Sequence, residues 1–261
     1  MRYIVCVKQV PDTNDVKIDP ETNTLVREGV PSILNPFDQF ALEEAIKMKK
    51  DGDEIIAISM GPPQAKKALM KCLALGADKA ILLSDRAFAG ADTWATAITL
   101  ATAIKKIGKF DVIFAGLQAI DGDTAQVGPE IAGQLGIPQI TYVEEVLKIE
   151  GKRLEAKTVT DDGYNIVEAK LPVLIAGITP SSFEPSNPAM RAILMAKKKP
   201  LETWTVADFD VDKENFGLEG SLTQVIKVYP PPINEKGVIY ADEPEIAVKN
   251  LFDKLSEDLV I

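Results

Sequence analysis

The sequence predicts an α/β protein built on a parallel sheet. Short apolar runs rich in β-branched residues, typical of strands buried on both faces, recur through the first half of the chain. They lie at residues 3–7, 55–60, 79–83 and 112–115. Helix-like segments separate them, and strand–helix alternation every roughly 20–30 residues is typical of βαβ units with parallel strands.

The expected helices have recognisable ends. Each has apolar residues at helical spacing and a glycine near its end. The first follows Asn35-Pro36-Phe37-Asp38 and stops by Gly52, and the others span residues 64–75 and 91–107. Two short alternating segments within residues 16–30 predict a hairpin before the first helix.

The pattern changes after Pro138 to alternating strands joined by glycine turns, which predicts an antiparallel extension. These strands are expected at residues 140–149, 153–159 and 164–169, followed by an apolar strand at 171–178. A short helix over residues 190–196 leads into the basic cluster Lys197-Lys198-Lys199, either a solvated helix end or a docking patch for an acidic partner.

Two regions are expected: an α/β domain over residues 1–200 that binds a nucleotide, and a C-terminal arm over residues 201–261. The arm contains a triple proline and one amphipathic helix, residues 243–259. It has few apolar residues of its own to bury, so it should pack on another surface, that of this domain or of a partner.

Composition excludes several functions. A net charge of −10 disfavours nucleic acid and anionic membranes as main partners. The chain has no histidine and two cysteines without paired spacing, which excludes a Ser-His-Asp or Cys-His site and disfavours a metal site or a disulfide framework. No signal peptide and no run of about 20 apolar residues is apparent, so we expect a cytoplasmic protein without a membrane span.

The most informative stretch runs from Asp111 to Gly136: a strand, a loop and a helix that must begin within about one turn before Pro129. Asp123 or Thr124 is the predicted N-cap and Gly136 the C-terminal stop. The free N–H groups would then lie at residues 125–128, which with the helix dipole could bind an anion such as phosphate.

An ordinary capped turn is the alternative for this stretch. The loop contains no GxxxxGK[ST] or GxGxxG motif. Asp121 and Asp123 would repel phosphate unless they cap, face away, or bind sugar hydroxyls or ring N–H groups. Ligands of parallel sheets bind beyond the carboxyl ends of the strands, where this loop would join the ends of the other strands in one rim.

Several motifs, in order, resemble the beta-subunit family of electron-transfer flavoproteins over essentially the whole chain. They are VKQVPD, NPFDQFALEEA, SMGPPQA, LALGADKAILLSD, AGLQAIDGDTAQVGPEIAGQLGIPQ, KLPVLIAGI, MRAILMAKKKP and GVIYADEPEIAVKNLFDKL. The resemblance implies an adenine-nucleotide α-hydrolase-like (Rossmann-like) fold. It also implies a heterodimer with an alpha subunit, which the C-terminal arm would embrace.

The resemblance also implies two sets of functional residues. The cofactor-binding set lies at the rim and the central loop: Cys6, Asn35, Pro36, Phe37, Asp38, Met60, Asp121, Gly122, Asp123, Thr124, Ala125, Gln126, Val127, Gly128 and Pro129. The second set would dock an acyl-CoA dehydrogenase or other flavin dehydrogenase: Arg191, Ile193, Leu194, Met195, Lys197, Lys198 and Lys199.

The family leaves the nucleotide open. One branch is a housekeeping carrier to a quinone reductase with structural AMP in the beta site. The other is flavin-bifurcating, with FAD there, and passes electrons from NADH to a ferredoxin or flavodoxin and a dehydrogenase. DGDTAQVGPEIA and DRAFAGADT resemble the bifurcating branch, so we expect FAD, with NADH oxidation only as a complex.

Two rivals share the fold. One is a non-redox adenine-nucleotide sensor, which would leave the arm and the docking motif unexplained. The other is an ATP-dependent ligase-like enzyme, which the missing Ser-Gly-Gly motif after the first strand disfavours.

Overall fold

A computed structural model of the protein describes residues 1–12, 31–226 and 237–258. The predicted hairpin at residues 16–30 lies outside this part of the chain. Two compact units are present, Met1–Ile226 and Lys227–Ile261, and each is described by itself.

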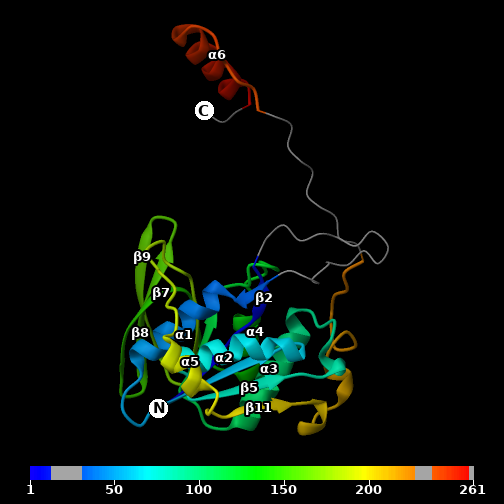
Figure 1. Cartoon of the computed structure of the whole chain (residues 1–261). Helices are drawn as coiled ribbons and strands as arrows, with labels where there is room; N and C mark the ends of the chain where they lie inside the picture. The colour runs from blue at the N-terminus through cyan, green and yellow to red at the C-terminus, as the bar shows by residue number, and fades with distance from the viewer. Residues whose placement is uncertain (13–30, 227–236, 259–261) are drawn as a thin grey trace. The chain divides into compact units, whose positions relative to one another are not determined.

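Within the described residues of the first unit, nine strands form one sheet in the order β11-β5-β4-β1-β6-β10-β7-β8-β9 (Figure 1). Their bounds are β1 Arg2–Cys6, β4 Glu54–Met60, β5 Lys79–Leu83, β6 Val112–Gly116, β7 Gln139–Glu150, β8 Arg153–Thr160, β9 Gly163–Lys170, β10 Val173–Gly177 and β11 Leu201–Trp204. The pairs from β11 to β7 are parallel, and β7, β8 and β9 pair antiparallel. The predicted α/β class with an antiparallel extension is confirmed. A separate short pair joins β2 Gln9–Pro11 to β3 Ser32–Leu34.

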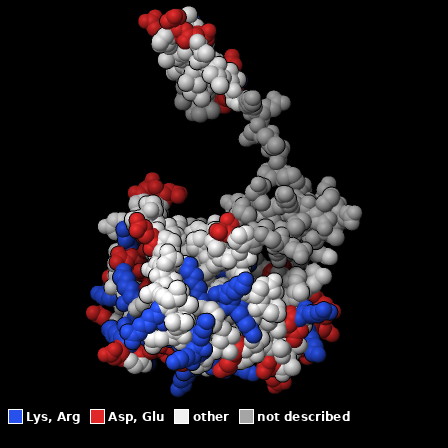
Figure 2. Space-filling view, in the orientation of Figure 1, with Lys and Arg blue, Asp and Glu red and all other residues white. Residues whose placement is uncertain are grey.

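Helices cover both faces of the sheet. Helices α1 Pro36–Met48, α2 Lys66–Leu75 and α5 Met190–Ala196 contribute to one hydrophobic core, and α3 Thr93–Ile107 and α4 Val127–Leu135 to the other. Figure 2 shows Lys and Arg side chains gathered over the face that carries α1, α2 and α5 in that view. No helix among the described residues is both long and apolar enough to cross a bilayer.

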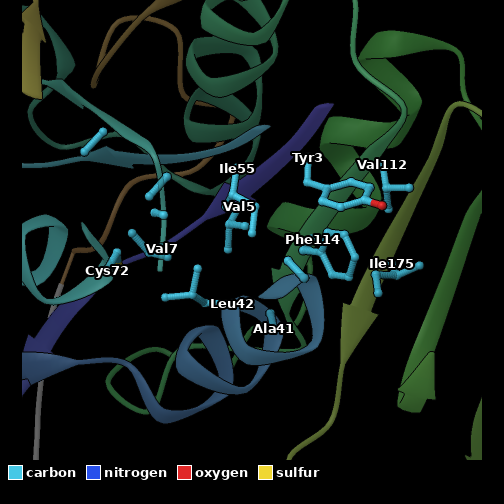
Figure 3. Packing of buried hydrophobic residues seen from close by; sticks show 14 of the residues in the cluster. Tyr3, Val5, Val7, Ala41, Leu42, Ile55, Cys72, Val112, Phe114 and Ile175 are labelled. Atoms are coloured by element: carbon cyan, nitrogen blue, oxygen red, sulfur yellow. The ribbon is translucent and has the colours of Figure 1, made fainter. Parts of the chain in front are cut away.

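Alternation along the central strand explains the two cores. Tyr3 and Val5 of β1 face α1 and α2, whereas Ile4 and Cys6 belong to the opposite core. Figure 3 shows Val5 close to Leu42 of α1, with Tyr3 beside Phe114 of β6. A strand buried on both faces must be apolar at every position, which the runs in the sequence predicted.

Residues 201–226 belong to the first unit, so the structure divides the chain 26 residues later than the predicted boundary at 200/201. Strand β11 extends the sheet by pairing with β5, and Val206 and Phe216 are buried. The sequence did not predict that residues 201–226 belong to the first unit, because the segment is rich in Asp and only a few of its large side chains are buried.

The second unit contains helix α6, Pro244–Glu257, in which no residue is buried. Its large apolar side chains are exposed, by 54% for Ile246 and 58% for Phe252. This agrees with the amphipathic pattern, and the described residues of the second unit do not cover the apolar face themselves.

Candidate functional site: a cleft at the carboxyl ends of the central strands

The sheet has its topological switch point beside β1. The chain passes from β1 to β4 on one side and later reaches β6 on the other. Ligands of open α/β sheets bind beyond the carboxyl ends of strands at such a point. A cleft of about 770 Å³ lies here, lined by residues that follow β1, β4, β5 and β6: among them Lys8, Met60, Gly61, Ser84, Asp85, Arg86 and Asp121.

Asp38, in the first turn of α1, ties two of these strand ends together. Its carboxylate accepts a hydrogen bond from the Lys8 amide at 2.7 Å and another from the Gly116 amide. Burial raises the pKa of Asp38 to about 7, although these bonds act to lower it. Gly116 permits the close approach, because a Cβ there would lie 2.7 Å from the carbonyl carbon of Phe37.

Asn35 holds the central loop, residues 117–126 between β6 and α4, from the interior of the protein. The side chain is fully buried; its Nδ2 donates to the Gln118 carbonyl at 2.8 Å, and its Oδ1 accepts from the Ile120 amide at 3.4 Å. Both polar atoms of the amide are therefore engaged inside the protein, and Asn35 positions the loop.

The two loop carboxylates also have internal partners. Asp121 pairs with Lys8 Nζ at 2.7 Å, and Asp123 accepts from Gln118 Nε2 at 2.9 Å. The predicted repulsion of an anion is reduced, because one carboxylate is neutralised by a cation and the other is held by an amide.

The start of α4 differs from the prediction. Neither Asp123 nor Thr124 is the N-cap: the helix begins at Val127, and the N-cap is Gln126, which makes no side-chain capping bond. The reason is a tight turn, in which the amides of Gly122 and Asp123 both donate to the Ala119 carbonyl. Those two amides are therefore unavailable for an anion, although both residues are in the predicted cofactor-binding set. The predicted start within one turn before Pro129 and the stop at Gly136 are confirmed.

The next five amides remain free. Within the described chain, the N–H groups from Thr124 to Gly128 have no hydrogen-bond acceptor. Ala125 has a left-handed φ of 53°, and Gln126 after it is right-handed. Successive residues of opposite hand form an anion-binding nest of N–H groups, here at the positive end of a helix.

The predicted cofactor residues do not all lie together. Asn35, Pro36, Phe37 and Asp38 stand at the start of α1, where Asn35 contacts the loop, and Gly122 and Asp123 form the tight turn. Met60 and Asp121 line the cleft, and the residues from Thr124 to Pro129 form the open helix start. Cys6 lies in the core beneath; burial, with a smaller contribution from Asp38, raises the pKa of its thiol to about 12, so it remains neutral. The prediction omitted Lys8 as a site residue, although its position after the first strand was a usable signal.

The predicted docking segment forms α5. Ile193, Leu194 and Met195 are 38%, 56% and 55% exposed, and Arg191, Lys197 and Lys198 are exposed as well. Lys199 differs, because its ammonium group donates to the carbonyls of Leu73 at 2.9 Å and Ala77 at 2.6 Å. Lys199 therefore fastens this segment to α2 and is not a free surface cation.

Comparison with known proteins identifies the family. The family model of the electron transfer flavoprotein domain matches residues 22–209. An electron transfer flavoprotein subunit beta from Clostridium acetobutylicum is 51% identical over 99% of both chains. The chain belongs to the electron transfer flavoprotein beta-subunit family.

Other relatives cover nearly the whole chain. The subunit CarD of the caffeyl-CoA reductase–Etf complex from Acetobacterium woodii is 48% identical over the full length of both chains. Protein FixA from Bradyrhizobium diazoefficiens is 42% identical over 98% of this chain and 91% of its own. Electron transfer flavoproteins are flavin-associated, so the free amides and the cleft are the features to compare with a flavin nucleotide.

Proposed function

We propose that this chain binds FAD in the cleft and works as the beta subunit of a heterodimeric, flavin-bifurcating electron transfer flavoprotein. The observation that carries the proposal is the open start of α4, with free amides from Thr124 to Gly128. It follows closely on Asp121, the residue of this loop that lines the cleft at the switch point. Such a cluster fits the two negative phosphates of a dinucleotide.

The residues present fit a pyrophosphate group. The nest at Ala125, Gln126 and Val127 would hold the phosphates, with side-chain bonds from Thr124 and Gln126. Lys8 supplies a nearby cation, although it is half exposed and already paired with Asp121. Asp121 would accept hydrogen bonds from sugar or ring groups. When bound, the flavin supplies the redox chemistry, while the protein binds, orients and tunes it.

FAD is favoured over AMP for two reasons. The cleft volume of about 770 Å³ lies within the range of small-molecule and cofactor sites, about 300–1,000 Å³. Gly122, in the exposed turn of the loop, also has no heavy atom within 4 Å of the position that a Cβ would take, so this residue would not obstruct the larger of the two ligands.

NADH would deliver two electrons to the heterodimer, one passing to a ferredoxin or flavodoxin and one to a flavin dehydrogenase. The name of the Acetobacterium woodii relative, which pairs an Etf with a caffeyl-CoA reductase, supports a CoA-thioester dehydrogenase as that partner. The alpha subunit would cover the apolar face of α6, and the exposed residues of α5 would dock the dehydrogenase.

A nucleotide count tests the proposal. The chain is co-produced with its alpha subunit, the heterodimer is purified, and nucleotides are released with acid and quantified. Two FAD per heterodimer is the expected result. One FAD with one AMP would make the chain a housekeeping carrier with a structural nucleotide, and a heterodimer without flavin would leave the nucleotide-sensor interpretation.

A further inference from the structure

The segment before α5 is fastened to α1 by a polar clamp, which we define as Gln39, Glu43 and Ser186. The Glu43 carboxylate accepts hydrogen bonds from both the amide and the hydroxyl group of Ser186, each at 2.9 Å. Gln39 Nε2 donates to the Ser186 carbonyl at 2.8 Å and to Glu43 at 2.9 Å. The backbone N–H, the carbonyl and the side chain of Ser186 are therefore all held by one helix.

Two further contacts extend the clamp. Gln39, which is only 2% exposed, accepts at Oε1 from Lys71 Nζ of α2 at 2.8 Å. The ring of Phe183 packs edge-on against Phe40, with ring centroids 5.2 Å apart. The segment before α5 is thus tied to α1, and Lys71 of α2 supports the clamp through Gln39.

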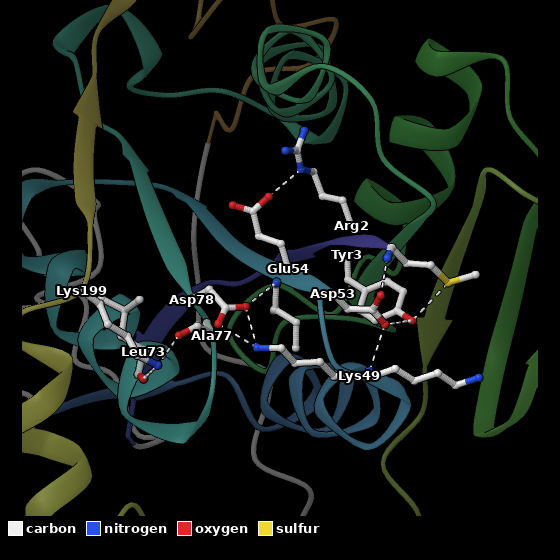
Figure 4. Close-up of polar contacts among 12 residues, drawn as sticks. Arg2, Tyr3, Lys49, Asp53, Glu54, Leu73, Ala77, Asp78 and Lys199 are labelled. Atoms are coloured by element: carbon white, nitrogen blue, oxygen red, sulfur yellow. Dashed lines mark hydrogen bonds and ion pairs between the residues drawn. The ribbon is translucent and has the colours of Figure 1, made fainter.

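Lys199 fastens the other end of α5. Figure 4 shows its side chain directed at the carbonyls of Leu73 and Ala77, at the C-terminal end of α2. Carbonyls at a helix end lack intrahelical donors, and a lysine ammonium satisfies them. Ser186 and Lys199 are therefore fixed points on either side of α5.

Between these points, α5 has little support of its own. The helix has seven residues, and only Ala196 is buried. Isolated helices of this length are not stable in water. The conformation of its exposed apolar residues, Ile193, Leu194 and Met195, must therefore depend on packing against α2 and on the two fastenings.

We propose that Glu43 is a positioning residue for partner docking: with Gln39 and Lys199 it holds α5 in the conformation that the dehydrogenase recognises. The inference rests on the proposed docking function of α5. Association costs free energy for every loop and side chain that must be ordered, so a segment ordered beforehand binds more tightly. Glu43 would act on affinity through Ser186 without touching the partner.

The test uses the complete heterodimer and measures electron transfer with the acyl-CoA dehydrogenase of the same organism, its acyl-CoA as donor. Glu43→Ala should raise the KM for the dehydrogenase about fivefold with kcat within about twofold, since net hydrogen bonds are worth about 1 kcal/mol each. Alanine preserves the helix. Ser186→Ala, which removes only the hydroxyl bond, should shift KM in the same direction by less.

Glu184→Ala is the matched control. Glu184 is an exposed carboxylate two residues before Ser186 and outside the clamp, so this variant removes one negative charge beside the clamp and none of the hydrogen bonds to Ser186. Its KM should equal that of the wild type. Equal effects of Glu184→Ala and Glu43→Ala would assign the change to charge and overturn the inference.

A double-mutant cycle with Leu194→Ala separates this inference from the docking proposal. If Glu43 acts through α5, the two effects on KM should combine to less than their product, because Leu194 binds poorly once α5 is misplaced. Three outcomes would overturn the positioning role of Glu43. They are a double variant whose change in KM equals the product of the two single changes, an unchanged KM in Glu43→Ala, and loss of nucleotide from Glu43→Ala. An unchanged KM in Leu194→Ala would instead overturn docking by α5 itself.

Discussion

Helices α3 and α4 pack against each other on one face of the sheet, yet their starts are built in opposite ways. At α3, the Asp92 carboxylate caps the Ala95 amide at 2.9 Å and also accepts from the amides of Leu222 and Thr223 at 2.8 and 2.9 Å. At α4, Gln126 makes no capping bond. One start is closed by a side chain and a passing segment, and the other is open.

This difference indicates which helix start is available to a ligand. A side-chain N-cap is worth about 1 kcal/mol, and the chain uses one at α3 but omits it at α4. The left-handed residues Asp123 and Ala125 add strain at the open start. An anion at the amides of α4 would compensate for both costs, which is the arrangement expected of a binding site.

The largest expected effect is at the open start. Thr124→Trp should reduce beta-site nucleotide from one per heterodimer to under about a tenth, because the indole would occupy the nest that the phosphates need. Acid release and quantification of nucleotides measures it. Thr160→Trp, at an exposed position of β8, is the control. Full occupancy in Thr124→Trp would remove the central loop from the site.

A substitution at the closed start of α3 should lower the stability of the protein and leave the nucleotide content of the heterodimer unchanged. Asp92→Ala should lower the free energy of unfolding by about 2 kcal/mol, since the cap and the bonds to residues 222–223 are both lost. Urea denaturation of the heterodimer, with a nucleotide count beside it, measures both properties. Loss of nucleotide at unchanged stability would reverse the roles of the two helix starts.

The Asp92 carboxylate should also make the stability of the fold depend on pH in the acidic range. Burial acts to raise the pKa of Asp92, but its hydrogen bonds from Ala95 and Thr223 prevail and lower it. Because the pKa of Asp92 is lower in the folded state than in the unfolded state, this group stabilises the fold at pH values above its unfolded pKa of about 3.9. That contribution is lost as the pH falls through its folded pKa. The stability difference between the wild type and Asp92→Asn should therefore shrink from pH 5 to pH 3.

Asp38 should show the opposite sign. Its folded pKa of about 7 lies above the unfolded value, so the folded state binds the proton more tightly and this group's contribution falls as pH rises from about 4 to 7. The stability of Asp38→Asn relative to the wild type should increase by about 2 kcal/mol between pH 5 and pH 7. Urea midpoints across that range measure it, and a flat difference would contradict the raised pKa.

The comparison of the two helix starts also shows what the sequence could predict. The buried strands and glycine stops follow from local chemistry, so the parallel sheet and the end of α4 at Gly136 were predictable. The start of α4 was not, because the turn depends on which carbonyl, here that of Ala119, takes the amides of Gly122 and Asp123. The roles of Asn35 and Asp38 as supports required knowing that α1 lies against the end of β6, a contact between distant segments.

The exposed face of α6 has a consequence for the cell. A helix of fourteen residues that buries no side chain within its own unit is marginal by itself, and until a surface covers it, its apolar residues would be open to chaperones and proteases. A copy of this chain without its partner would then be the copy that is removed. The balance between the two subunits would be maintained after synthesis, by degradation of whichever beta chains have not assembled.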